Sequence, residues 1–292
     1  MRQEVRPEVD AELCTNCLRC VAACAFQVLK AGKQAPRARG AGRCLACGQC
    51  VAVCPTGAIT HSLLPADDFV ELPAEAPVTM PALLDLLRRR RSIRRYRDEP
   101  VPDEVIRQLI DAAVLAPSGH NAQSWHFTVI RDAQRLQKIR DCVIGFYEKL
   151  LKMLDSPLKR PVLRLIAGRR GFQALRGARG PLSMLIRDHH RGQDRILWGA
   201  PALILAHAPK ADLTGAESCH YAVANMMLAA TSMGLGTCLI GFLTIPAQRH
   251  RPLRDELRVP PDHELHAALV VGYPDLEFVR NVPRRKPPVE ML

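Results

Sequence analysis

Two stretches of the chain share one cysteine spacing and decide its N-terminal fold: CTNCLRCVAAC at residues 14–24 and CLACGQCVAVCP at residues 44–55. Each stretch reads C-x2-C-x2-C-x3-C, and together they hold eight of the eleven cysteines. Two evenly spaced quartets favour metal binding over disulfide bonds if the protein lies in a reducing compartment. The other three cysteines are scattered and are interpreted as small apolar residues: Cys142, Cys219 and Cys238.

The cysteine block resembles bacterial-type ferredoxins over roughly 50 residues, and the resemblance implies two 4Fe–4S clusters. In such proteins the fourth cysteine of each quartet binds the other cluster. The implied ligand sets are Cys14, Cys17, Cys20 and Cys54 for one cluster, and Cys44, Cys47, Cys50 and Cys24 for the other. Structural zinc is the alternative, but zinc sites take their four ligands in two pairs. Ala25 replaces the usual proline of the family, so the local turn is expected to differ.

The chain is long enough for two domains, because it has 292 residues and 48% of them are hydrophobic. We expect a cysteine-rich domain at 1–64, a proline-rich linker at 65–81 and a second domain at 82–292. In the second domain helix and strand patterns intermix without a regular βαβ alternation, which predicts an α+β fold. The expected helices lie at 83–91, 103–116 and 217–234, and the expected strands at 125–130, 202–208, 237–242 and 266–273.

Three separated motifs in the second domain suit a flavin: RRRRSIRRY at 88–96, LAPSGHNAQSWHF at 115–127 and GLGTCLIGF at 234–242. The first alternates cations with a hydroxyl, which suits a phosphate, although a solvated basic helix end would look the same. The second places amides that both donate and accept in a tight loop before a strand. The third is a glycine turn into a strand, and it lacks the third glycine of a dinucleotide fold.

Together the motifs resemble the nitroreductase family in its ferredoxin-fused branch, apart from an insertion at about 134–195. The resemblance implies a central mixed sheet flanked by helices, and a homodimer with an FMN at each of two sites that both subunits build. By motif position, Arg90, Ser92 and Arg94 would hold the phosphate, while Pro117, Ser118, Gly119, Asn121 and Gln123 would reach the flavin from the partner subunit. In the tail NVPRRKPP, Arg285 would be a second phosphate contact, with Arg284 the next choice.

The same resemblance places Leu239, Ile240 and Gly241 along the flavin ring, with the backbone of Ile240 and Gly241 near its N5 atom. Some members have an acid where Ile240 stands, and many have proline where Ser124 stands. No catalytic side-chain acid is therefore assigned. The candidates considered are His120, His189, His190, His220, Tyr147 and Tyr221.

Most of the formal charge of +12 lies in one segment, because residues 142–195 hold twelve Lys/Arg and four Asp/Glu, a net of +8. No pattern of interleaved aromatic residues accompanies it, which argues against a nucleic-acid platform. The segment either attracts an acidic substrate or partner, or is a solvated helical cover. The chain has no apolar run long enough for a membrane span and no signal-peptide pattern, so a cytoplasmic location is expected.

The expected function is electron transfer from an external low-potential donor, such as a ferredoxin or flavodoxin, through the clusters to FMN. From there electrons would pass to a nitroaromatic, a quinone or another conjugated small molecule. Two alternatives stay open at this point. One is a dehalogenase, an ene reductase or flavin fragmentation on the same fold, and the other is an electron-transfer flavoprotein that serves a protein partner.

Overall fold

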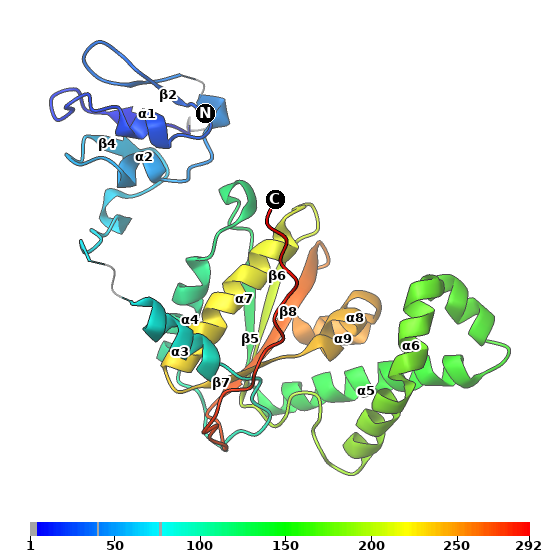
Figure 1. Ribbon diagram of the computed structural model, residues 1–292. Coiled ribbons are helices and arrows are strands. Elements are labelled where there is room, and N and C mark those ends of the chain that lie inside the picture. Colours follow the sequence, from blue (N-terminus) through cyan, green and yellow to red (C-terminus); the bar gives the residue numbers. More distant parts are fainter. Residues whose placement is uncertain (1–4, 40, 76–77) are drawn as a thin grey trace. The chain divides into compact units, whose positions relative to one another are not determined.

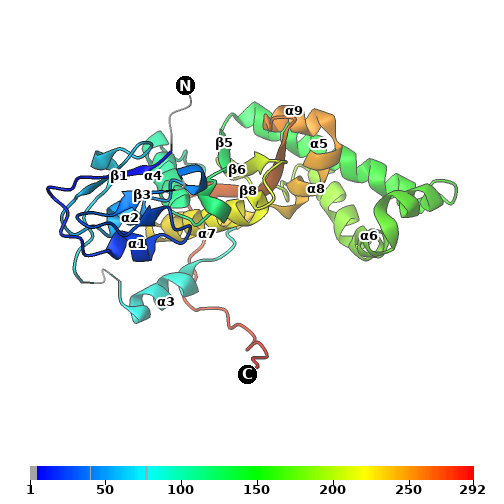
Figure 2. The ribbon, with the colours of Figure 1, turned by 90° about the horizontal axis from the view of Figure 1, so that it is seen from above.

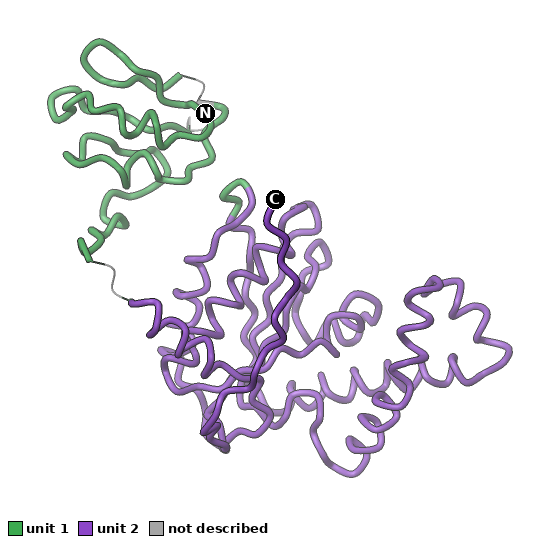
Figure 3. The backbone as a smooth tube through the Cα atoms, in the orientation of Figure 1, with its two compact units in different colours: residues 1–78, 120–122 green, residues 79–119, 123–292 purple. Residues whose placement is uncertain are grey.

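The computed structural model describes residues 5–39, 41–75 and 78–292. The chain divides into two compact units, coloured separately in Figure 3: 1–78 with 120–122, and 79–119 with 123–292. Most of the expected linker, 65–81, is part of the first unit, where the aromatic ring of Phe69 lies against Gly48. Positions 76 and 77 of that linker lie outside the described residues.

The N-terminal unit is built from very short elements. Its strands are β1 (Pro7–Val9), β2 (Leu29–Lys30), β3 (Arg37–Ala38) and β4 (Ile59–His61), and its helices are α1 (Arg19–Ala23), α2 (Gln49–Ala52) and the 3-10 turns Ala41–Arg43 and Ala66–Asp68. The strands form two antiparallel pairs, β1 with β4 and β2 with β3. Each α-helix carries the third cysteine of one quartet, because Cys20 lies in α1 and Cys50 in α2. The hydrophobic core of this unit is correspondingly small.

The C-terminal unit is organised around a four-stranded sheet in the order β5-β6-β8-β7. The strands are β5 (His126–Ile130), β6 (Ala202–Pro209), β7 (Gly236–Leu239) and β8 (His263–Gly272). All three ladders are antiparallel, and the only parallel element among the described residues is an isolated bridge from Ser92 to Thr237 of β7. The expected mixed sheet is thus mixed only at its β7 edge, and the α+β class is confirmed.

Helices cover both faces of this sheet (Figures 1 and 2). Along β6, Leu203 and Leu205 join one buried cluster, whereas Ile204 and Ala206 join the other. Side chains alternate between the two faces of a strand, so a strand that is buried on both sides reads as one continuous apolar run. One face is covered by α4 (Asp103–Val114) and α7 (Gly215–Ser232), and the other by α5 (Ala133–Asp155), α8 (Gly241–Arg249) and α9 (Arg251–Leu257).

Two remaining helices complete the unit, α3 (Met80–Arg89) and α6 (Arg160–His190). The side chain of Thr79 caps α3 by accepting a hydrogen bond from Ala82 N at 3.4 Å. Together α5 and α6 form a hairpin that extends away from the sheet in Figure 1. Within α6 the backbone breaks at Gly168, whose φ of 66° and ψ of 172° are not helical. No described helix is long and apolar enough to cross a membrane.

Candidate functional site

The two cysteine loops, 14–20 and 44–50, adopt the same unusual backbone conformation. Left-handed residues follow the first cysteine at the same two positions in each loop: Asn16 (φ 49°) and Leu18 (φ 60°), and Ala46 (φ 49°) and Gly48 (φ 72°). For a residue other than glycine this conformation costs about 1–2 kcal/mol and persists only where the surroundings require it. Here it accompanies an amide directed at sulfur, because Asn16 N donates to Cys14 Sγ at 3.3 Å. Such loops suit an anionic thiolate cluster.

The eight quartet cysteines gather in two groups. Cys14, Cys17, Cys20 and Cys54 line one small cavity. The thiols whose charges act on Cys50 are those of Cys47, Cys24 and Cys44. Each group thus combines three cysteines of one quartet with the fourth of the other. The predicted ligand sets follow this grouping, although they stay predictions.

The electrostatics of both groups fit a cationic cluster. Burial and the neighbouring thiols raise the pKa of Cys50 to about 11, so a bound cation would be needed to stabilise its thiolate at neutral pH. Burial also opposes ionisation of Cys54, but hydrogen bonds from Thr56, Ala58 and Gly57 outweigh it and lower the pKa of that thiol. Among the described residues no three His, Cys, Asp or Glu side chains could hold a single metal ion. A cubane takes one thiolate per iron and does not need the tight convergence of a zinc site.

A cluster of cations lies beside β7 in the C-terminal unit. Ile93 N donates to Thr237 O at 2.9 Å, which holds the segment around Ser92 alongside this strand. Burial raises the pKa of the Cys238 thiol, whereas the charge of Arg94 and hydrogen bonds to Ser92 and Arg94 lower it by a smaller amount. The charge of Arg90 also lowers the pKa of Cys238. The structure therefore brings together the three residues that are predicted to bind the FMN phosphate: Arg90, Ser92 and Arg94.

One tail arginine joins this cluster. Burial lowers the pKa of Arg90, and the nearby charges of Arg284 and Arg91 lower it further. Within the described chain no carboxylate forms an ion pair with Arg90, Arg94 or Arg284. Cations held together without an acid are suited to a bound anion such as phosphate. Of the two predicted tail residues, Arg284 is the one near Arg90, so the preference for Arg285 is not supported by this arrangement.

The loop with the second motif lies at the other edge of the sheet. It leads into β5, whereas the cation cluster adjoins β7, and β6 and β8 separate these strands. Pro117 opens the loop, Ser118 Oγ accepts from Gln123 N at 3.0 Å, and a Cβ on Gly119 would clash with the side chain of Thr214. Within one chain these residues therefore lie apart from the residues that are predicted to bind the phosphate.

Asn121 of the same loop belongs to the N-terminal unit. Its Nδ2 donates to the carbonyls of Leu45 and Ala46, at 3.2 and 3.0 Å. Asn121 and Gln123 both have positive φ, 54° and 47°. The predicted contacts of this loop with a flavin stay predictions.

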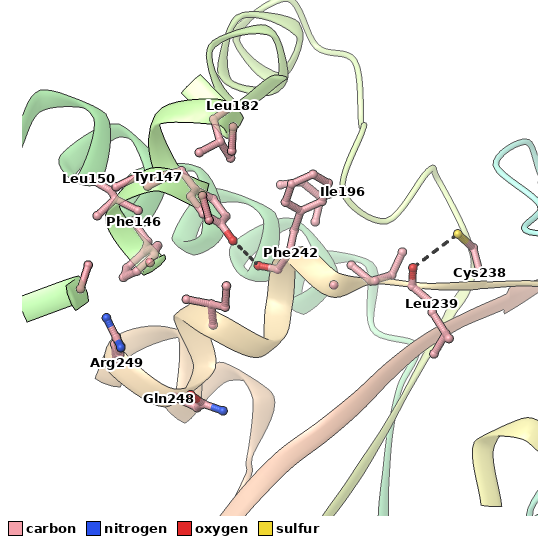
Figure 4. A pocket seen from close by; sticks show the side chains of 18 of the residues that line it. Phe146, Tyr147, Leu150, Leu182, Ile196, Cys238, Leu239, Phe242, Gln248 and Arg249 are labelled. Carbon is pink, nitrogen blue, oxygen red and sulfur yellow. Dashed lines mark hydrogen bonds between the residues drawn. The ribbon is translucent and has the colours of Figure 1, made fainter. Parts of the chain in front are cut away.

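An apolar cavity of about 640 Å³ lies next to the cation cluster, among β7, α5, α6 and α8 (Figure 4). Arg94, Leu239, Ile240 and Gly241, all predicted site residues, belong to its lining. The expected strand at 237–242 is wrong in its second half: β7 ends at Leu239 and α8 begins at Gly241. Ile240 N still donates to Ala268 O at 2.8 Å, and the chain turns into the helix directly after this last sheet contact.

The cavity has few groups that could transfer a proton. Its described lining contains no carboxylate and no histidine, so none of His120, His189, His190 and His220 lies there. Tyr147 does line it, and its hydroxyl donates to Phe242 O at 3.2 Å. Burial raises the pKa of Tyr147 to about 12, which keeps the hydroxyl protonated at neutral pH.

Sequence reasoning missed most of the remaining lining. Phe146, Leu150, Leu163 and Leu182 come from the insertion, and Phe242 and Ile245 come from α8. Their apolar spacing on α5 and α6 is a detectable signal for helices, but not for which face lines a cavity. A pair of buried imidazoles was also missed: His207 Nδ1 lies 2.9 Å from His263 Nδ1, and the exposed His126 packs against both.

Comparisons with known proteins agree with both halves of this description. Residues 87–273 match the model of the nitroreductase family, and residues 13–59 match that of the 4Fe-4S dicluster domain. The nitrobenzene nitroreductase of Ectopseudomonas oleovorans is 29% identical over 212 residues, or 70% of this chain and 91% of that protein. Iodotyrosine deiodinase 1 of Rattus norvegicus is 40% identical over 81 residues, or 26% of this chain and 28% of that one.

A solved structure shows the same fold. The nitroreductase with bound FMN from Bacteroides fragilis NCTC 9343 superposes with a TM-score of 0.53 at 21% identity, over 72% of this chain and 98% of that chain. The two resemblances inferred from the sequence are thus confirmed, and the predicted cofactors agree with FMN in this relative and with the dicluster domain in this chain.

Proposed function

Because this chain belongs to the nitroreductase family and carries a 4Fe-4S dicluster domain, we propose that it is an FMN-dependent oxidoreductase fed through its own clusters. An external low-potential donor supplies electrons, which pass through two 4Fe–4S clusters to FMN and on to a conjugated small molecule. FMN exchanges electrons singly or in pairs, so it suits the junction between one-electron clusters and a two-electron acceptor.

The observation that carries the proposal is the cation cluster at the edge of the apolar cavity. Arg90, Arg94 and Ser92 gather around Cys238, and Arg284 lies near Arg90 without a carboxylate partner in the described chain. This arrangement supports a phosphate at the cluster and an isoalloxazine ring in the cavity. Leu239, Ile240 and Gly241 would then lie along the ring, with the backbone of Ile240 and Gly241 as the groups next to it.

A second copy of the chain is part of the proposal. The loop 117–123 leads into β5, at the sheet edge opposite β7, so one chain supplies only one half of the predicted flavin contacts. A homodimer in which each β5 loop reaches the partner's cavity completes both sites. The left-handed residues of this loop support an unusual backbone that serves a binding role.

The cavity supports an apolar, conjugated acceptor such as a nitroaromatic or a quinone. Apart from Arg94 and Cys238, its polar lining is confined to Tyr147, Trp198, Gln248 and Arg249. Apolar walls exclude water and bind planar rings. Tyr147 keeps its phenol proton at neutral pH, and its hydroxyl donates that proton in a hydrogen bond to Phe242 O.

Two alternative functions are each supported by a specific observation. Similarity to an iodotyrosine deiodinase over 81 residues keeps reductive dehalogenation as a second reaction on the same site. The basic α5–α6 hairpin keeps an electron-transfer flavoprotein that serves a protein partner as a third possibility. Steady turnover of small acceptors by the purified protein separates both enzymatic readings from the carrier.

The test is an anaerobic titration of the purified protein with a reduced ferredoxin, followed by absorbance spectroscopy. We expect the cluster and flavin bands to bleach together, and the flavin band to return when a nitroaromatic, quinone or halogenated phenol is added. Bleached clusters beside a flavin that stays oxidised would refute the electron path.

A matched control uses NAD(P)H in place of the ferredoxin. We expect slow or absent reduction, since a fused pair of clusters has no role if a nicotinamide serves the flavin directly. Fast flavin reduction by NAD(P)H with clusters left oxidised would contradict the proposed donor and leave the FMN assignment standing.

A further inference from the structure

One stretch of the insertion contains basic residues but no acidic residue. Residues 156–187 contain eight Lys/Arg and no Asp or Glu. Among them, Arg179 pairs with Asp155 at 2.8 Å and Arg160 donates to Leu154 O at 2.9 Å. The six others have no ion-pair partner in the described chain, and four of these six lie within residues 159–170: Lys159, Arg164, Arg169 and Arg170. Their charge is therefore available to a partner outside this chain.

The same stretch exposes large aliphatic side chains next to these cations. Leu158 is 88% exposed, Leu165 85%, Ile166 62% and Val162 52%. Val162, Leu165 and Ile166 follow one another at i, i+3 and i+4, so they share one face of α6. We call these three residues, together with Leu158 before the helix and the four unpaired cations on either side of the break at Gly168, the outer α6 surface.

The opposite side of the helix is buried. Leu163 is 4% exposed, and Leu163, Ala167 and Leu182 line the cavity of Figure 4. Because α6 already buries one apolar side, its exposed aliphatic side is not needed for packing within this unit. The hairpin extends away from the sheet (Figure 1), and the side chains of the outer α6 surface are exposed in the chain.

We propose that the outer α6 surface docks this protein on an anionic lipid bilayer. A basic, aliphatic helix face that is too polar to span a membrane lies in the interfacial plane, with the aliphatic groups inserted and the cations at the headgroups. Each Lys or Arg near an anionic surface adds to the attraction, and long basic side chains reach back to the headgroups.

Other occupants fit these residues less well. A second copy whose two-fold axis passed through this surface would oppose like charges, because the stretch 156–187 has no acid to pair with them. A nucleic acid would favour exposed aromatic rings, but the aromatic residue of this stretch, Phe172, is 9% exposed. An acidic protein would match the cations and leave the four exposed aliphatic side chains without a role.

The test is flotation of the full-length, cofactor-loaded protein with vesicles of phosphatidylglycerol or of phosphatidylcholine. We expect binding to the anionic vesicles at low ionic strength, and a loss of about tenfold or more in high salt or with the zwitterionic lipid. Leu165→Asp/Ile166→Asp and Arg169→Glu/Arg170→Glu should each weaken binding by about tenfold or more.

Matched controls place the same changes elsewhere on the C-terminal unit. Leu213 is 94% exposed and Lys138 is exposed on α5, so Leu213→Asp and Lys138→Glu should leave flotation unchanged. Iron content, flavin content and circular dichroism confirm that each variant folds. The proposal is overturned if the wild-type protein does not float, or if the α6 variants float as well as it does. It is also overturned if the α6 variants change only the oligomeric state or only the capture of an acidic ferredoxin.

Discussion

The two units of this chain are each stabilised in a different way. The core of the N-terminal unit consists of Cys20, Leu29, Cys50 and Ile59, and two of these four are predicted cluster ligands. The C-terminal unit buries large apolar clusters on both faces of its sheet. A unit with so small a core gains its stability from bound metal, whereas a large double-sided core is stable through packing. Loss of a cofactor and loss of packing should therefore disrupt different parts of the chain.

The largest effect is expected from a cluster ligand. Cys50→Ser should lower iron from about eight to about four per chain and remove amide exchange protection across 5–75, because the ligand set and the core share this residue. Iron analysis and hydrogen exchange measure both outcomes.

Cys142→Ser is the matched control, since Cys142 lies in α5 outside both quartets. Its iron content and exchange pattern should equal those of the wild type. Full protection of 5–75 in the Cys50 variant would contradict the claim that bound metal stabilises the N-terminal unit, because this unit would then be stable without its complete clusters.

The packed unit should respond to a cavity in its core. Leu205 of β6 is fully buried, so Leu205→Ala should lower the free energy of unfolding of the C-terminal unit by about 2–5 kcal/mol. Leu213→Ala, at a position 94% exposed, should change it by less than about 0.5 kcal/mol. Urea titrations followed by tryptophan fluorescence measure this, and a fall in iron content with Leu205→Ala would show that the two units are coupled.

A smaller effect is expected at the cation cluster, where two neighbouring arginines can be compared directly. Arg284→Ala should weaken FMN binding by about tenfold, or ~1.4 kcal/mol, because Arg284 lies near Arg90. Arg285→Ala should have little effect. Flavin fluorescence titration of the apoprotein gives both dissociation constants, and an equal loss in the two variants would remove the distinction that the structure makes between them.

The smallest effect concerns pH. Burial and the charges of His263, His126 and His266 lower the pKa of His207 to about 4, from about 6.5 in the unfolded chain. Between these values the unfolded state binds a proton that the folded state does not, so stability is complete above about pH 6.5 and falls as the pH drops towards 4. Between pH 6.5 and 5.5 we expect this group alone to cost about 1 kcal/mol of stability. Unfolding midpoints of the wild type and of His207→Gln across this window should differ in slope, and parallel slopes would contradict the assignment.

The two units also differ in how far the sequence predicts them. The cysteine spacing predicts the cluster domain because three thiols and their loop are local in the chain. Helices such as α4 and α7 and the strands β5, β6 and β8 follow from apolar periodicity and propensity. The end of β7 at Leu239 could not be predicted, because TCLIGF is equally apolar on both sides of the turn into α8.

The sequence by itself determined the cofactor class, through its motifs and the families they resemble, and the α+β fold, through its apolar patterns, and it predicted the residues of a phosphate site. Only the tertiary structure decided that Arg284 joins Arg90, that Tyr147 lines the cavity and that β5 and β7 lie at opposite sheet edges. It also decided which face of α6 is buried. The physical reason is that contacts between residues far apart in the chain depend on how whole elements pack, and no local pattern encodes the partner of a packed face.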